Sequence, residues 1–287
     1  MSDESRVLVF GRAGWLGSAV GALLDARRET VCAPPSNEVD VRDADAVARM
    51  ITEVAPTAVL NLAAAQPGAT ADDLNRVNVD GARNVAGACA RGGVRLVHIS
   101  TDALHDGRSA PYADDAPANP LTEYGRSKAL GEAAVLALHP PALCVRTSLL
   151  WDPRAMDRGT RAFAERIRAG APCRLFTDEI RCPLHRDALA EALLDLIDHP
   201  VRGTLNVVGR EAMSRSDFAL ALLRHFDVAG VERVELVRSA DLERAGEARR
   251  PRDLRLVVAT AEALLDRRLP GVTEMLRPPG GADSRPV

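Results

Sequence analysis

The first half of the chain alternates short aliphatic runs with longer alanine-rich stretches, and this alternation limits the fold more than any other feature. Runs such as RVLVF and ALCVRTS lack a regular alternation of polar and apolar residues, so strands formed by them would be buried on both faces. The stretches between the runs are long enough for helices. This pattern predicts an α/β fold with a doubly wound parallel sheet, the Rossmann arrangement.

The same pattern predicts two domains. From residue 151 the elements become shorter and richer in proline and arginine. We therefore expect a dinucleotide-binding domain over residues 1–150 and a smaller, substrate-binding domain over residues 151–287. The segment 184–207, with a helix near 186–198, is expected to return to the first domain. The C-terminal sequence RPPGGADSRPV is rich in proline and glycine and is expected to be disordered. The other helices are expected near residues 14–28, 43–54, 71–91 and 121–138.

Composition excludes several classes of protein. The 287 residues carry a net charge of -3, which gives no sign of a nucleic-acid or membrane surface. No apolar run approaches the roughly 18 residues of a membrane span, and no secretory signal is visible. The five cysteines show no CxxC spacing, which is typical of reduced thiols, and no residues have metal-ligand spacing. We expect a cytoplasmic protein that binds a small molecule and no metal.

A glycine-rich turn follows the first expected strand, in the sequence VLVFGRAGWLG. Its glycines permit a tight turn, close approach to a pyrophosphate and close packing of helix on strand. The helix that starts here offers free N–H groups to an anion. The alternative is a glycine-rich turn without a ligand. The context favours a dinucleotide site with contacts from Gly11, Arg12, Gly14, Trp15, Leu16 and Gly17.

Cofactor choice is predicted from the second strand. An acidic residue at its end would bond the adenosine ribose and favour NAD, and none occurs between Ala33 and Ser36. Arg12 could then meet a 2′-phosphate, the alternative being a solvated surface arginine. We expect NADP rather than NAD. Further cofactor contacts are expected at Asp40 and Val41, in a strand-to-helix loop where an adenine ring could rest. Ala63 and Ala64, at the end of the third expected strand, have small side chains that would let the cofactor pass close to them.

The helix near 121–138 contains a lysine that the composition singles out. Lysine and arginine together number 37, and Lys128 is the only lysine among them. It follows Tyr124 by four positions, so both side chains share one helix face. A tyrosine has a pKa near 10, and a neighbouring ammonium group is expected to lower that pKa toward neutrality. Arginine is flatter and stays charged, so it would not replace this lysine.

The fourth expected strand ends in HISTD, which places Thr101 at its carboxyl end, where open α/β sheets bind their ligands. Its hydroxyl is expected to hold a carbonyl oxygen near Tyr124, with Ser100 beside the cofactor. The alternative is an ordinary exposed Tyr–Lys pair on a helix. We predict that Thr101, Tyr124 and Lys128 are catalytic, and that the last two also contact the cofactor.

These motifs, in this order, resemble an extended short-chain dehydrogenase/reductase. The resemblance is greatest to the dTDP-4-dehydrorhamnose reductase group and runs from GRAGWLG through HISTD, TEYGRSKALGE and VRTS to RPRDLRL. It implies an NAD(P)H-dependent ketoreductase that acts on the 4-keto group of a nucleotide-linked deoxysugar or a related metabolite. It also implies that Tyr124 donates a proton to the carbonyl oxygen as a hydride arrives from the nicotinamide.

Two substrate positions differ from the group's usual pattern. Ala103 stands where the group has a tyrosine, and Leu149 stands where it has a tryptophan. Later, Arg181 and Cys182 interrupt a Gly-Ser-Pro-Thr pattern. We therefore expect Thr101, Ala103 and Leu149 to line a substrate pocket that is wider than the one for dTDP-4-keto-rhamnose.

Other functions on the same scaffold stay open. An epimerase is one alternative, and a non-catalytic NADP-binding regulatory subunit, which needs no proton donor, is another. A dehydratase is disfavoured because it would carry Asp-Glu after the threonine, whereas Ala103 follows Asp102 here. A homodimer is a further expectation. His98 is expected to be a core residue, and a nucleotide diphosphate or solvent is expected at Arg250, Arg252 and Arg255.

Overall fold

The computed structural model describes residues 6–27, 30–32 and 39–277. Two expectations therefore lie outside the described residues: the absence of an acid between Ala33 and Ser36, and the disorder of the C-terminal sequence after residue 277. Within the described residues, no helix is long and apolar enough to cross a membrane.

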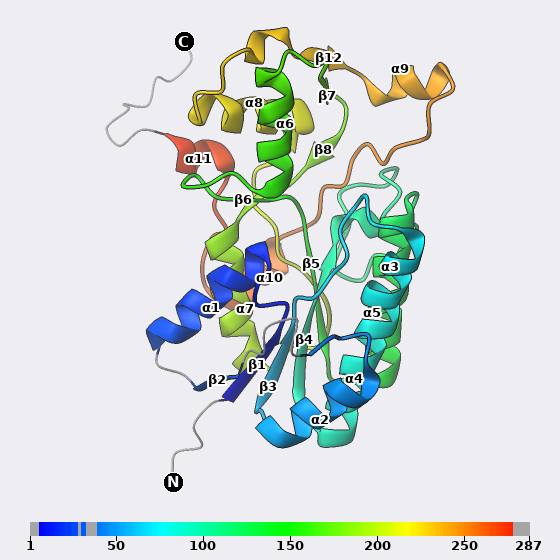
Figure 1. The fold of residues 1–287 in the computed structure, drawn as a ribbon, viewed down its shortest axis with the longest axis vertical. Helices are drawn as coiled ribbons and strands as arrows, with labels where there is room; N and C mark the ends of the chain where they lie inside the picture. Colours follow the sequence, from blue (N-terminus) through cyan, green and yellow to red (C-terminus); the bar gives the residue numbers. More distant parts are fainter. Residues whose placement is uncertain (1–5, 28–29, 33–38, 278–287) are drawn as a thin grey trace.

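A six-stranded parallel sheet forms the centre of the molecule, in the order β10-β5-β4-β3-β1-β2 (Figure 1). The expected doubly wound α/β fold is confirmed. Its last strand comes from the segment that was expected to return from the second half of the chain. The strands are β1 Arg6–Phe10, β2 Thr30–Cys32, β3 Ala58–Asn61, β4 Arg95–Thr101, β5 Leu143–Thr147 and β10 Gly203–Asn206.

Helices cover both faces of the sheet (Figure 1). Successive residues of a strand point to opposite faces, so Val7 and Val9 belong to one apolar cluster while Leu8 and Phe10 belong to the other. The first cluster lies under α1 and α7, and the second under α2, α4 and α5. These helices are α1 Trp15–Arg27, α7 Arg186–Asp198, α2 Ala44–Val54, α4 Ala82–Gly92 and α5 Glu123–Leu138.

The helix expected near residues 71–91 is not a uniform α-helix. It starts as α3 Ala71–Asn75, widens into a π-helical segment at Arg76–Gly81 and continues as α4. Single π-helical turns often occur at functional sites. Here the widened turn lies against α5, because a Cβ atom at Gly131 would approach the carbonyl oxygen of Asn78 to 2.0 Å.

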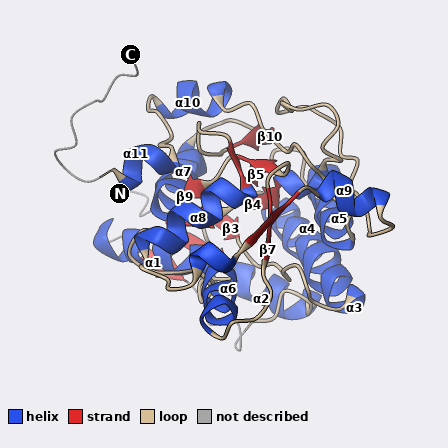
Figure 2. Cartoon of the chain, turned by 90° about the horizontal axis from the view of Figure 1, so that it is seen from above, coloured by secondary structure: helices blue, strands red, loops and turns tan. Residues whose placement is uncertain are grey.

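The second half of the chain builds a C-terminal lobe beyond the carboxyl edge of the sheet (Figures 1 and 2). It contains three two-stranded sheets, which pair β11 with β8, β12 with β7 and β6 with β9. Helix α10 returns to the central sheet and packs near β10 and α7. The strands are β6 Leu150–Trp151, β7 Arg174–Phe176, β8 Ile180–Arg181, β9 Leu184–His185, β11 Met213–Ser214 and β12 Glu235–Val237. The helices are α6 Arg158–Arg168, α8 Arg215–His225, α9 Ser239–Arg244, α10 Ala259–Leu265 and α11 Val272–Leu276.

Candidate active site

The carboxyl ends of β1, β3 and β4 meet at one edge of the sheet, below the C-terminal lobe. The direction of winding reverses between β1 and β3, since β2 lies on one side of β1 and β3 lies on the other. Parallel sheets bind ligands at such a reversal. Gly11, Ala63 and Thr101 follow or end these three strands, so the sequence motifs converge here.

The glycine turn after β1 has room for backbone only. Gly11 has a φ of 86°, and a Cβ atom there would lie 2.7 Å from the backbone nitrogen of Ala63. A Cβ atom at Gly17 would lie 2.2 Å from the carbonyl oxygen of Gly11. Helix α1 begins at Trp15, directly after the turn, so the N–H groups of its first turn face this edge. The local geometry fits a pyrophosphate.

Arg12 lies along α1. Its guanidinium forms an ion pair with Asp25, with 2.8 Å between Nη2 and Oδ2. Gly21 makes room for it, because a Cβ atom at that position would lie 2.6 Å from Nε of Arg12. The arginine is thus neither fully solvated nor free to turn toward an anion without breaking this contact.

The loop before α2 is held in place at both residues expected to meet the adenine. Asp40 pairs with Arg42 at 2.6 Å, and this hydrogen-bonded partner lowers the pKa of Asp40. The carbonyl oxygen of Val41 accepts a hydrogen bond of 2.9 Å from Asn84, and its side chain is buried against Gly81.

Asn78, in the π-helical segment, fixes the loop that contains Ala63 and Ala64. Its side-chain oxygen accepts from the backbone nitrogen of Ala65 at 2.8 Å, and Nδ2 donates to the carbonyl oxygen of Ala65 at 3.0 Å. Nδ2 also lies 2.9 Å from the hydroxyl of Ser127 on α5. Sequence reasoning missed Asn78. The sequence did offer one signal: Asn78 is a polar residue in a helical segment that packs on other elements.

Helix α5 carries Tyr124 to the end of β4. The helix starts where the Thr122 hydroxyl accepts from the backbone nitrogen of Gly125 at 3.0 Å. A Cβ atom at Gly125 would lie 2.1 Å from the carbonyl oxygen of Ala103, so only glycine allows the two backbones to come this close. As a result Tyr124 and Thr101 interact through their side chains.

Lys128 lies one turn further along α5 and is almost completely buried, with 1% of its surface exposed. Its Nζ donates a hydrogen bond of 2.7 Å to the carbonyl oxygen of Ile99 on β4. Burial lowers the pKa of Lys128 to about 8, because the charged form loses its hydration. The exposed Tyr–Lys pair, considered as the alternative, does not describe this site.

The expected lowering of the Tyr124 pKa is wrong for this structure. Burial raises the pKa of Tyr124 to about 12, the negative charge of Asp102 adds to the rise, and the hydrogen bond with Thr101 opposes it. The ammonium group of Lys128 instead bonds to the backbone of Ile99. Tyr124 therefore keeps its proton across the physiological pH range, as a proton donor must.

Asp102 and Ser148 complete a group of polar side chains around Thr101. The Thr101 hydroxyl donates to Oδ1 of Asp102 at 3.2 Å and accepts from the backbone nitrogen of Ala103 at 3.2 Å. Ser148, directly after β5, donates to Oδ2 of Asp102 at 2.6 Å. Sequence reasoning missed Ser148, although its place at a strand end matched that of Thr101. The hydroxyl of Ser100 is buried and has no hydrogen-bond partner among the residues that the structure describes.

The other two expected pocket residues, Ala103 and Leu149, follow the ends of β4 and β5. Ala103 is in the 3₁₀ turn Asp102–Leu104 after β4, and Leu149 follows Ser148. Leu149 is half-buried and packs against the apolar cluster around Trp151. Both positions thus border the carboxyl ends of β4 and β5.

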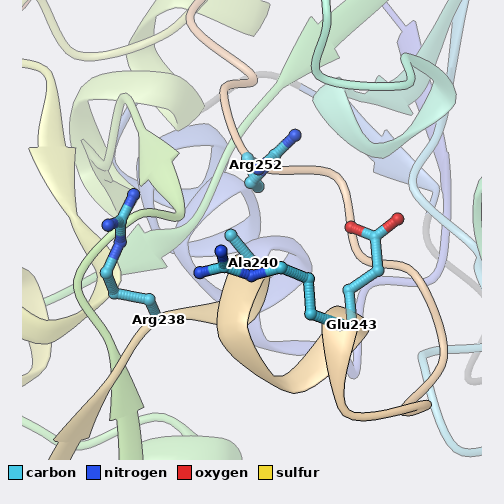
Figure 3. A pocket seen from close by; sticks show the side chains of 5 residues that line it. Arg238, Ala240, Glu243 and Arg252 are labelled. Atoms are coloured by element: carbon cyan, nitrogen blue, oxygen red, sulfur yellow. The ribbon is translucent and has the colours of Figure 1, made fainter.

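The three late arginines have different surroundings. Arg255 pairs with Asp253 at 2.7 Å, and Arg250 pairs with the fully buried Glu179. Arg252 faces a cavity of about 460 Å³ between α9 and its own loop (Figure 3). That cavity is also lined by Arg238, Ala240, Glu243 and Arg244.

Two further expectations concern His98 and metals. His98 is buried in β4, and burial lowers its pKa well below the usual value, so it is a neutral core residue. The fold brings Asp152, His185 and Asp187 together, a grouping that sequence spacing did not indicate. Both carboxylates already pair with Arg154 and Arg186, which neutralise them.

Comparison with known proteins gives one consistent family. The family model described as the RmlD substrate binding domain matches residues 5–277. A dTDP-4-dehydrorhamnose reductase of Mycolicibacterium smegmatis is 34% identical over 236 residues, which cover 79% of this chain and 70% of that protein. A dTDP-4-keto-6-deoxy-D-glucose reductase of Streptomyces niveus is 40% identical over 160 residues, covering 53% and 55% of the two chains.

A solved structure supports the same family. The dTDP-4-dehydrorhamnose reductase from Bacillus anthracis, crystallised in complex with NADP, superposes with a TM-score of 0.83 at 25% identity and covers 95% of this chain and 97% of that one. The resemblance to extended short-chain dehydrogenases/reductases is confirmed. Since the family model spans almost the whole chain, the protein belongs to the RmlD family, whose relatives include the dTDP-4-dehydrorhamnose reductases.

Proposed function

We propose that the protein is an NADPH-dependent reductase of the 4-keto group of a dTDP-linked deoxysugar. The observation that carries this proposal is the side-chain contact of Tyr124 with Thr101 at the carboxyl end of β4. Lys128 is buried one turn further along α5, and the glycine turn lies at the carboxyl end of the nearby strand β1. The reductase names of the relatives and the NADP complex of the B. anthracis protein support it.

The residues present fit a dinucleotide. The Gly11 turn leaves a cradle that a Cβ atom would fill, and the first turn of α1 points unpaired N–H groups at it. NADPH, when bound, supplies the hydride. Lys128 would give the ribose hydroxyls the N–H donors that its hydrogen bond to Ile99 does not use. The loop with Ala63 and Ala64 would let the cofactor pass close to the backbone.

Tyr124 performs the proton transfer in the proposed reaction. Reduction of a ketone adds a hydride to carbon and a proton to oxygen, so the site needs a group that arrives protonated. With a pKa of about 12, the phenol of Tyr124 is protonated at every physiological pH. An alkoxide is a stronger base than a phenolate, so the transfer runs toward the substrate. The presence of such a proton donor favours a ketoreductase over a regulatory subunit, because a regulatory subunit needs no proton donor.

The substrate is the finer part of the proposal. Ala103 and Leu149 border the reaction centre where the group usually has aromatic rings. We propose a ketone that is bulkier or differently substituted than dTDP-4-keto-rhamnose. An epimerase leaves the oxidation state of its substrate unchanged and consumes no NADPH in net terms, so stoichiometric NADPH oxidation with formation of a carbinol separates the two activities.

The test is Tyr124→Phe. This change removes the proton donor and keeps the ring, so NADPH oxidation with a panel of dTDP-4-keto sugars should fall by roughly a hundredfold or more. NADPH affinity, measured by fluorescence titration, should change little. Turnover of the Phe variant at the wild-type rate would disprove the proposed mechanism.

We also propose a cytoplasmic location and a homodimer. The described cysteines, Cys89, Cys144, Cys173 and Cys182, are all free thiols, which supports a cytoplasmic location. We retain the homodimer as a proposal, and light scattering of the purified protein would test it.

A further inference from the structure

Asp102 holds a position that the proposed mechanism does not use. It follows Thr101 at the end of β4 and is 6% exposed. Its two carboxyl oxygens have separate partners, since Oδ1 accepts from Thr101 at 3.2 Å and Oδ2 accepts from Ser148 at 2.6 Å. The second distance is typical of a hydroxyl bonded to a charged carboxylate, whereas the first is longer than usual.

This arrangement fixes the direction of the Thr101 hydroxyl. The hydroxyl has one proton, which it gives to Asp102. It therefore accepts from the backbone nitrogen of Ala103 and, in its hydrogen bond with Tyr124, from the protonated phenol. A ketone oxygen can only accept hydrogen bonds. While Asp102 is ionised, Thr101 therefore has no proton left for a ketone.

A proton on Oδ1 of Asp102 reverses this direction. Oδ1 would then donate to the Thr101 hydroxyl, whose own proton becomes free for the ketone oxygen. Ser148 would continue to donate to Oδ2. One proton thus changes the longer bond and leaves the shorter bond as it is.

The surroundings of Asp102 permit both charge states. Arg181 on β8 and Arg215 on α8 face it as cations, and Cys182 and the phenol of Tyr124 face it as neutral groups. The guanidinium of Arg181 donates hydrogen bonds to the carbonyl oxygens of Ile180, Pro251 and Arg252. Among the described residues, no arginine nitrogen lies within ion-pair distance of Asp102. Burial raises the pKa of Asp102, and the two arginines only partly oppose this.

We propose that Asp102 is a positioning residue whose neutral form turns the Thr101 hydroxyl toward the substrate ketone. The inference rests on the proposed ketoreductase function. It also gives Ser148 a role. Ser148 holds Oδ2 in place, while Oδ1 accepts a hydrogen bond from Thr101 in the charged form and donates one to Thr101 in the neutral form.

The decisive variant is Asp102→Asn. An amide can accept from Ser148 through its oxygen and donate to Thr101 through its nitrogen, so it imitates the neutral acid. We expect Asp102→Asn to keep most of the wild-type kcat/KM and to lose the fall in kcat/KM that the wild type shows as pH rises through the Asp102 pKa. Asp102→Ala should lose roughly tenfold or more, because both hydroxyls lose their partner. An Asn variant as impaired as the Ala variant, or one with the wild-type pH profile, would overturn the proposal.

A second measurement does not depend on turnover. Infrared difference spectra of wild type against Asp102→Asn follow the protonated carboxyl band during a pH titration of the whole protein. We expect this band to persist above the ordinary aspartate pKa of about 3.9. Its loss at the ordinary pKa would refute the inference. If no dTDP-4-keto sugar is reduced by the wild type, the function fails, and the infrared titration still decides the state of Asp102.

Discussion

Lys128 shows why a chain so rich in arginine keeps one lysine. Its ammonium group is buried between α5 and β4, where the carbonyl oxygen of Ile99 is its one hydrogen-bond acceptor among the described residues. A guanidinium carries five N–H donors in a flat fork, and most of them would be left without a partner in this space. Burial also gives Lys128 a pKa of about 8, a property that arginine cannot acquire.

The first prediction at the residue scale concerns pH and Lys128. Below pH 8 the lysine is charged and can hold the cofactor ribose, and above pH 8 it loses its proton. We therefore expect kcat/KM of the wild type to fall as pH rises through about 8. Lys128→Arg should be strongly impaired at neutral pH, and its residual activity should lack this fall because the guanidinium stays charged. The measurement is a pair of pH–rate profiles, best recorded in an Asp102→Asn background. Near-normal turnover of the Arg variant would contradict the role given to the lysine.

Arg12 and Asp25 give a matched pair of variants for cofactor choice. If Arg12 leaves Asp25 to meet a 2′-phosphate, Arg12→Ala should weaken NADPH binding and leave NADH binding nearly unchanged. Asp25→Ala removes the competing carboxylate, so it should strengthen NADPH binding selectively. Titrations of both variants with both cofactors test this. An equal loss for NADPH and NADH in Arg12→Ala would show that the arginine does not read the phosphate.

Residues that belong to a local motif could be predicted from the sequence. Thr101 ends an apolar strand, and Tyr124 and Lys128 have a helix spacing, so each carries its signal in its neighbours. Ser148 and Asn78 have weaker local signals, a strand end and a polar helix residue, because the partners that give them a role are 46 and 13 positions away. The direction of the Tyr124 pKa shift was missed for a related reason: burial and the charge of Asp102 depend on the folded surroundings.

At the scale of elements, the contact of α5 with the turn after β4 decides whether the site forms. Gly125→Ala should favour the helix by propensity, by about 1 kcal/mol. The new Cβ would lie 2.1 Å from the Ala103 carbonyl oxygen, however, so α5 must move away and carry Tyr124 from Thr101. We expect a large loss of kcat, measured by NADPH oxidation. Gly87→Ala in α4 is the control, since its Cβ would meet only the end of Arg91 at 3.6 Å. Full activity of Gly125→Ala would contradict this interpretation.

The residues that follow β4 and β5 lead to a prediction about the substrate. Aromatic rings bury on the order of 150–250 Å² each, so Ala103 and Leu149 leave space that a tyrosine and a tryptophan would fill. We expect poor activity on dTDP-4-keto-rhamnose. Ala103→Tyr combined with Leu149→Trp should shift the ratio of kcat/KM values toward that substrate. A wild type that already reduces dTDP-4-keto-rhamnose efficiently would show that these two positions are neutral.

Element types and order followed from the sequence because apolar runs and alanine-rich stretches encode them locally. The helix at 186–198 has the expected bounds for this reason. The π-helical segment at Arg76–Gly81 could not be predicted, because it reflects packing against α5 rather than the composition of the segment. The short strands of the C-terminal lobe were equally hard to place, since strands of two or three residues carry almost no periodicity.

At the scale of the whole molecule, the chain crosses between the sheet and the C-terminal lobe several times. It leaves after β5, returns with α7 and β10, leaves again with β11 and returns with α10. Each of these crossings runs between the carboxyl edge of the sheet and the lobe. The candidate site lies at the same edge. The expected division into domains at residue 150 stays a prediction.

The position of β10 has a practical consequence for protein engineering. A fragment ending at residue 150 would expose the edge of β5, which β10 covers in the intact chain, and would remove α7 from the apolar cluster under α1. Such a fragment is expected to aggregate through the bare edge rather than to bind nucleotide. A chimera that borrows the lobe of a relative must exchange three separate stretches, 150–185, 210–258 and 271–277, because β9 pairs with β6 and α11 packs on the apolar cluster around Trp151. Libraries aimed at new sugar specificity are best built by grafting the three stretches together.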